Sequence, residues 1–258
     1  MADQSVGATA PLGVGQIVSE CFSLLFSRIG VFFLLTFIPT LISIAISTGY
    51  FGTGMYTGEV DPAELMSAFS SPLSIVVLVV VPMVIYGLST ALIVCAAYDA
   101  KLGRPARIGQ YFTIALARVV PVSLVSLVVG IIAGIGFMLL LIPGLYLAAL
   151  FSVAVVVVVL ESMWFGALGR SIQLTKGYRW PILGALILLY LVVIGINLVL
   201  GLFSVALFST SPIIGIIVYS AFGAIGSALL SIGFVLIYAR LREIKEGVSV
   251  DAIAEVFS

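Results

Sequence analysis

The chain has 258 residues, of which 62% are hydrophobic and only 9% are charged, and its mean hydropathy is +1.34. Soluble domains carry roughly 25% charged residues, so a water-facing surface cannot be built from this composition. The eleven basic and eleven acidic residues give a net charge of zero, which offers nucleic acid no overall electrostatic attraction. The composition therefore predicts an all-α, polytopic integral membrane protein.

The sequence contains no histidine and two cysteines, Cys21 and Cys95. This excludes catalysis by Ser-His-Asp or Cys-His groups, zinc bound by histidine and haem held by a proximal histidine. Two cysteines are also too few for a metal site made of cysteine alone. We therefore expect no enzymatic activity, no metal and no cofactor.

Six stretches are candidates for membrane crossing, because a bilayer core needs a helix of about 20 mostly apolar residues. They cover residues 29–49, 73–97, 119–142, 145–160, 181–207 and 213–239. The Pro143-Gly144 pair between the third and fourth predicts a tight helical hairpin, with a single bent helix as the alternative. Residues 1–258 are expected to form one membrane domain that ends in a cytoplasmic tail at 240–258.

The basic residues indicate the topology of these six spans. All eleven lie at Arg28, within 101–118, within 170–179 or within 240–245. The connections between these segments, 50–72, 143–144 and 208–212, contain none. Because Lys and Arg are retained on the cytoplasmic side, we expect an even number of crossings and cytoplasmic N- and C-termini.

Three amphipathic helices are expected on the cytoplasmic side, at residues 12–27, 105–118 and 162–178, because polar side chains recur there at three- and four-residue steps. Each runs directly into a membrane span. One surface helix followed by two membrane helices is thus repeated three times, over about 12–97, 105–160 and 162–239. The pattern predicts a weak threefold internal repeat, and convergent amphipathic patterning is the alternative explanation.

Basic residues near the interface are candidates for contact with anionic phospholipid head groups, where each exposed one contributes about 1 kcal/mol. The candidates are Arg28, Lys101, Arg104, Arg107, Arg118, Arg170, Lys176 and Arg179. The membrane orientation already requires these charges, which is the alternative explanation for them.

Small residues are candidates for helix packing within the monomer or in a homo-oligomer. Gly130 and Gly134 form a GxxxG sequence in the third span, and Gly223, Ser227 and Ser231 continue a small-xxx-small pattern in the sixth. Asn197 in the fifth span is expected to hydrogen-bond across helices. No Asp, Glu, Lys or Arg falls deep within a predicted span.

Two further features concern ligands and partners. Pro39 and Pro82 lie within the first and second spans, where they free backbone carbonyls for a substrate or for neighbouring Ser and Thr hydroxyls. In the tail, a short helix is expected to present an apolar face for docking on the bundle or on a protein partner. Its candidate docking residues are Val250, Ile253 and Phe257.

One stretch resembles a known bacterial family. The residues Ile142-Pro143-Gly144-Leu145-Tyr146, Glu161, Gly166-Ala167, Arg170-Ser171, Leu174-Thr175-Lys176-Gly177 and Trp180 are similar to the core motif of the membrane domain fused to some glycerophosphodiester phosphodiesterases. The likeness covers nearly the whole chain and is distinctive at 142–181. It implies a stand-alone module of the bacterial cytoplasmic (inner) membrane. It brings no catalytic residue, because the esterase activity of that family resides in a separate domain.

These features lead us to expect a non-enzymatic membrane module that organises lipid or scaffolds a partner, for example as an accessory subunit of a larger complex. The reasons are the lack of charges within the spans and the amphipathic cytoplasmic face. The alternative is a carrier or flippase for a small amphiphilic molecule, since internal repeats are common among transporters. That alternative requires a polar or wet cavity between the repeats.

Overall fold

The computed structural model describes residues 12–52, 63, 66–67 and 69–247, and these are helical with no strand. Within them, six helical segments are long and apolar enough to cross a membrane: Ile29–Phe51, Pro72–Lys101, Ile108–Leu139, Leu141–Leu160, Arg179–Val199 and Pro212–Glu246. The prediction of an all-α, multi-pass membrane protein is therefore confirmed. The predicted docking residues Val250, Ile253 and Phe257 lie outside the described residues.

The described chain folds mostly into helices, since lipid requires each backbone group to bond within its own segment. In chain order they are α1 (Val14–Ser27), α2 (Ile29–Phe51), α5 (Pro72–Ile75), the π-helix η1 (Val76–Val80), α6 (Val81–Lys101), α7 (Ile108–Leu139), α8 (Leu141–Phe151), α9 (Ala154–Leu160), α10 (Gly166–Thr175), α11 (Arg179–Thr210) and α12 (Pro212–Glu246).

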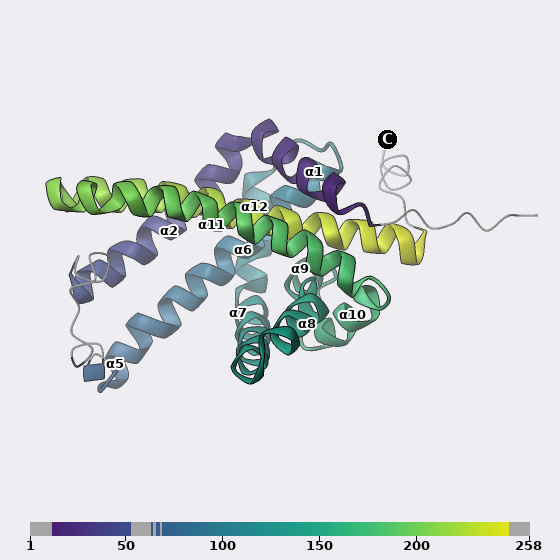
Figure 1. The fold of residues 1–258 in the computed structure, drawn as a ribbon, viewed down its shortest axis with the longest axis horizontal. Helices are drawn as coiled ribbons and strands as arrows, with labels where there is room; N and C mark the ends of the chain where they lie inside the picture. The colour runs from purple at the N-terminus through teal and green to yellow at the C-terminus, as the bar shows by residue number, and fades with distance from the viewer. Residues whose placement is uncertain (1–11, 53–62, 64–65, 68, 248–258) are drawn as a thin grey trace, which may run out of the picture.

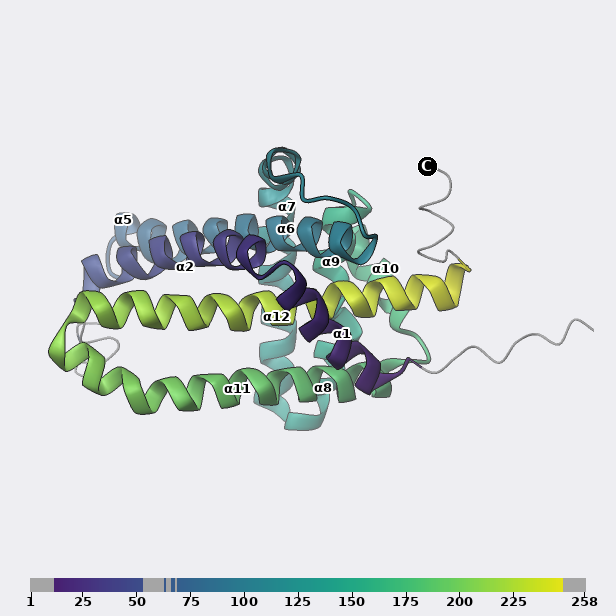
Figure 2. The same cartoon turned by 90° about the horizontal axis from the view of Figure 1, so that it is seen from above.

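The membrane helices form three pairs that point in different directions (Figure 1). Helices α11 and α12 run side by side along the long axis, and α2 and α6 form a second pair at an incline to them. Helices α7 and α8 form the third pair, and α7 runs across the direction of α12 in both views. The pairs meet near α1, α9 and α10 (Figure 2), and α2 and α6 diverge from α11 and α12 away from that region, as the view of Figure 1 shows.

The packed core lies at the end where the pairs meet. Its side chains come mainly from α1, α6, α9 and α12, and include Ile17, Leu92, Val157, Ile232 and Leu236, which are all nearly inaccessible. Helix α9 is apolar all round and buried, because it lies between the pairs rather than against lipid. The opposite ends of the pairs present exposed apolar side chains, as suits contact with lipid.

One of the three predicted surface helices is not separate. Helices α1 and α10 are distinct from the membrane helices that follow them, whereas predicted helix 105–118 forms the first turns of α7. The reason is the backbone at the junctions. Arg28 leaves the helical conformation after α1, and Gly177 has a φ of +85° after α10. No such residue separates the two parts of α7, and the threefold repeat therefore stays a prediction.

The hairpin between the third and fourth spans turns at a different residue from the one predicted. Leu140 is extended and breaks the helix, and α8 begins again at Leu141. Pro143 then lies in the first turn of α8, where its missing N–H costs no helical hydrogen bond. Gly144 lies directly against Phe137, since a Cβ there would be 2.7 Å from the Phe137 nitrogen. The hairpin itself is as predicted.

Candidate functional site

The eleven basic residues all lie toward the end where the helical pairs meet. Five carboxylates are described there, and each forms an ion pair: Glu20, Asp99, Glu161, Glu243 and Glu246. The described residues at this end therefore carry an excess of positive charge. A membrane protein retains such charge on the cytoplasmic side, so the distribution agrees with an even number of crossings.

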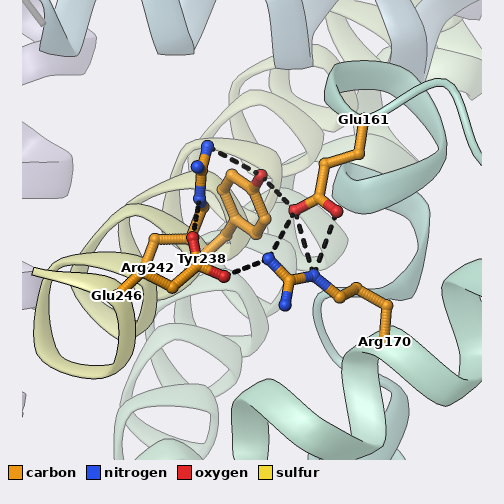
Figure 3. A network of polar contacts seen from close by, with 5 residues as sticks. All are labelled: Glu161, Arg170, Tyr238, Arg242 and Glu246. Atoms are coloured by element: carbon orange, nitrogen blue, oxygen red, sulfur yellow. Dashed lines mark hydrogen bonds and ion pairs between the residues drawn. The ribbon is translucent and has the colours of Figure 1, made fainter. Parts of the chain in front are cut away.

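A five-residue network joins α9, α10 and α12 at this end (Figure 3). The Glu161 carboxylate accepts a hydrogen bond from Arg170 Nε at 3.0 Å and from the Tyr238 hydroxyl at 2.8 Å. Arg170 also pairs with Glu246, which in turn accepts a hydrogen bond from Arg242 Nε at 2.8 Å. Burial alone would lower the pKa of Arg170, but the two carboxylates outweigh it and raise the pKa. The network fixes the surface helix α10 to the end of α12.

A second carboxylate plays a similar part at the end of α6. Asp99 is buried, accepts hydrogen bonds from Arg107 Nη2 at 3.0 Å and from the Tyr111 hydroxyl at 2.9 Å, and thus holds the start of α7. Asp99 precedes Arg107 by eight residues, and Glu161 precedes Arg170 by nine. In both places the carboxylate that ends one span binds an arginine of the next segment.

The predicted head-group residues differ in what they contact. Lys101, Arg107 and Arg170 pair with carboxylates of the chain. Arg28 donates to the backbone carbonyl of Arg104, and Lys176 is exposed and accepts a hydrogen bond from Lys245 through its carbonyl. Arg118 donates to the Ser162 hydroxyl, and Arg179 donates to the Tyr146 hydroxyl and lies 5.0 Å from the centre of its ring. Much of this charge is thus committed to holding the chain together.

An open cavity of about 540 Å³ lies between the three helical pairs. Its walls come from α2, α6, α7, α8, α9, α11 and α12, so every pair contributes. Some of its lining residues, such as Ile93 and Val156, belong to the packed core, so the core forms part of the wall. Among the described residues, no charged side chain lines it. The cavity is apolar with scattered hydroxyl groups.

The hydroxyls that line the cavity are distinctive because many have no partner in the protein. A serine or threonine in a membrane helix usually donates to a carbonyl of its own helix, as Thr36, Ser47 and Ser220 do here. In the part of the chain that the structure describes, five hydroxyls of the cavity wall form no side-chain hydrogen bond. They are those of Thr40, Ser43, Thr90, Ser126 and Ser231.

Two prolines shape the cavity wall. Pro39 has no N–H, so the Leu35 carbonyl loses its helical donor, and the Ser89 hydroxyl of α6 donates to it instead at 3.4 Å. Pro82 follows the π-helix η1, a distortion often found at functional sites. Both prolines line the cavity. The carbonyl freed by Pro39 thus accepts a hydrogen bond within the protein. This agrees with the interpretation that a neighbouring Ser or Thr hydroxyl, and not a substrate, binds it.

Several residues predicted to pack helices do not contact another helix of the monomer. A Cβ added at Gly130 or Gly134 would meet no atom within 4 Å, so neither packs against another helix of the monomer, and Gly130 lines the cavity. Asn197 is exposed and donates to Val193 of its own helix at 2.7 Å, not across helices. The packing prediction is wrong within the monomer for these three, because their side of the helix faces lipid or the cavity.

On α12 the predicted packing residues divide between a helix contact and the cavity. A Cβ at Gly223 would lie 3.8 Å from Thr40 of α2, whereas Ser227 and Ser231 line the cavity. The closest glycine contact between two pairs is elsewhere, at Gly87 of α6. A Cβ there would be 2.2 Å from Ser123 Oγ and 3.2 Å from the Val119 carbonyl. Sequence reasoning missed Gly87, because a lone glycine gives no spacing signal.

Comparisons with family models, with curated proteins and with solved structures found no match. The resemblance at residues 142–181 stays a prediction. Within the described residues, no three Cys, Asp or Glu side chains are grouped so that they could hold a metal ion. The two features that could bind a ligand are thus the basic end of the molecule and the hydroxyl-lined cavity.

Proposed function

We propose that this chain is a non-enzymatic membrane protein that holds a lipid-like amphiphile in the cavity between its three helical pairs. The observation that carries the proposal is the open cavity of about 540 Å³ in the middle of the molecule. This volume lies in the range of about 300–1,000 Å³ typical of ligand pockets. A close-packed centre would have favoured a purely structural role instead.

The proposal places the cavity in the membrane. The basic end is cytoplasmic, where its excess charge meets anionic phospholipid head groups, and the cavity opens toward the opposite leaflet. The positive charge of the described residues supports this orientation. The resemblance to the bacterial membrane domain supports a bacterial cytoplasmic membrane. A reporter fused after Gly52 and a reporter fused at the C-terminus are expected to lie on opposite sides of the membrane, the second in the cytoplasm.

Lipid retention by matched glycine variants tests the proposal. Gly130→Phe places a ring in the open space beside the cavity, and Gly134→Phe places the same ring one turn further along, off the cavity wall. Mass spectrometry of lipids that co-purify in mild detergent should show a loss for Gly130→Phe and the wild-type amount for Gly134→Phe. Equal retention by both variants would refute the proposal.

A carrier or flippase is the second candidate function, and the π-helix beside Pro82 favours it. This distortion directly precedes Pro82, which lines the cavity, and non-ideal turns of this kind can act as hinges. Reconstituted vesicles containing a fluorescent lipid analogue distinguish the two candidates. A carrier speeds the movement of the analogue between leaflets, whereas a protein that only holds lipid leaves that rate at the value of empty vesicles.

A role as an accessory subunit or scaffold is compatible with either function. Exposed aromatic side chains lie on the surface helix α1, at Phe26, and directly before α10, at Trp164 and Phe165. Cross-linking in the membrane followed by mass spectrometry would identify a protein partner or a second copy of the chain.

A further inference from the structure

The cavity wall bears on the chemistry of the head group that enters it. No described residue of the wall is charged. A phosphate in such a place loses its hydration without gaining a cation, which is costly even when lipid and water rearrange around it. The arginines and lysines that a phosphate requires are all at the basic end, and several already pair with carboxylates.

The wall does offer partners to an uncharged polar group. The unpaired hydroxyls come from four helices: Thr40 and Ser43 from α2, Thr90 from α6, Ser126 from α7 and Ser231 from α12. Each hydroxyl can donate one hydrogen bond and accept others, so together they suit a ligand with hydroxyl or carbonyl groups. Among the membrane-helix side chains that the structure describes, which leave out 200–202, 204–206 and 208–209, Thr48 is the one further Ser or Thr with a buried hydroxyl that has no partner. The unpaired hydroxyls therefore gather at the cavity.

The shape of the cavity fits a molecule with a small head and an apolar tail. The wall is mostly apolar, and the cavity is open, so a tail can extend from it between the separated pairs. Tyr86 and Tyr190 add two ring hydroxyls to the wall without adding charge.

Resting on the proposed function, we infer that the amphiphile has an uncharged, hydroxyl- or carbonyl-bearing head group, as in an acylglycerol, and not a phosphate. Each hydrogen bond to such a head group contributes a modest free energy, so losing one wall hydroxyl should weaken binding about fivefold. The exclusion of phosphate should be larger, at least about tenfold.

Three probes with the same acyl chain test the inference: monooleoylglycerol, oleoyl lysophosphatidylcholine and oleoyl lysophosphatidic acid. Native mass spectrometry of the purified protein with an equimolar mixture gives the occupancy of each. We expect monooleoylglycerol to exceed both phosphate-bearing probes at least about tenfold. Thr40→Val and Thr90→Val should each reduce its occupancy about fivefold, and Thr48→Val, which removes an unpaired hydroxyl off the wall, should not change it.

The outcomes separate this inference from the proposed function. Equal occupancy of the three probes, or a preference for lysophosphatidic acid, with loss of binding in Gly130→Phe, overturns the head-group class and leaves the cavity as the site. Absence of binding, or binding that survives Gly130→Phe, overturns both. Gel filtration and circular dichroism of each valine variant establish that it is folded, and because the two variants lie on different helices, either one alone suffices for the comparison.

Discussion

The network around Glu161 makes a testable contribution to stability. Its carboxylate is 16% exposed and its partner Arg170 is 25% exposed, so water screens the pair only in part. Glu161→Gln keeps the shape of the side chain but removes its charge. Losing one partner of a buried ion pair costs about 3–5 kcal/mol, and a charge-assisted hydrogen bond contributes about 1.5–3 kcal/mol. Because Glu246 still neutralises Arg170, we expect a loss of about 2 kcal/mol.

Thermal unfolding in detergent measures this loss. For a chain of about this size, 1 kcal/mol corresponds to roughly 2–4 °C, so Glu161→Gln should lower the unfolding midpoint by about 4–8 °C. The control is Glu243→Gln, which removes the more exposed partner of the Arg240 pair within α12. That pair should contribute at most about 0.5 kcal/mol. A midpoint of Glu161→Gln equal to that of wild type, or to that of Glu243→Gln, would refute the role assigned to the network.

Three further predictions follow from individual contacts. Gly87→Ala should destabilise the protein by about 1–3 kcal/mol, because the new Cβ meets Ser123, whereas Gly195→Ala, with no atom within 4 Å, should be neutral or stabilising in the same thermal assay. Burial and the neighbouring Glu20 raise the pKa of Cys21 to about 12. Iodoacetamide at pH 8 should therefore fail to alkylate this thiol until the protein is denatured. Rapid labelling of the folded protein would contradict the burial of Cys21. Ser89→Ala leaves the Leu35 carbonyl without its donor and should cost about 1 kcal/mol, a loss absent in Ser43→Ala, whose hydroxyl has no partner.

The sequence predicts the membrane helices well, because apolar length is a local property. Each of the six spans is present, and α12 continues beyond its predicted span to Glu246, where Gly247, with a φ of +65°, ends the helix. The turn at Leu140 could not be predicted, because leucine is an ordinary helix residue and the break depends on the contact of Gly144 with α7.

The candidate site was less predictable than the fold. Thr40, Thr90 and Ser231 lie in spans that the sequence predicts as mostly apolar, and their gathering around one cavity depends on how the helical pairs are arranged. The partnership of Arg170 with Glu246 spans 76 residues and leaves no local pattern. Gly130 and Gly134 have a spacing typical of helix packing, yet no helix lies against them on α7. Here a local pattern is present and the contact is not. Contacts between distant segments therefore require the structure.

The central claim is that the three helical pairs hold an amphiphile between them. The most direct test is a monoacylglycerol with a photoreactive diazirine near its head group, with the cross-linked residues mapped by mass spectrometry. The account predicts adducts on wall residues such as Tyr86, Leu230 and Phe234, which excess unlabelled monooleoylglycerol removes. Adducts confined to outward-facing residues such as Ile194 and Leu198, and unaffected by the competitor, would contradict it.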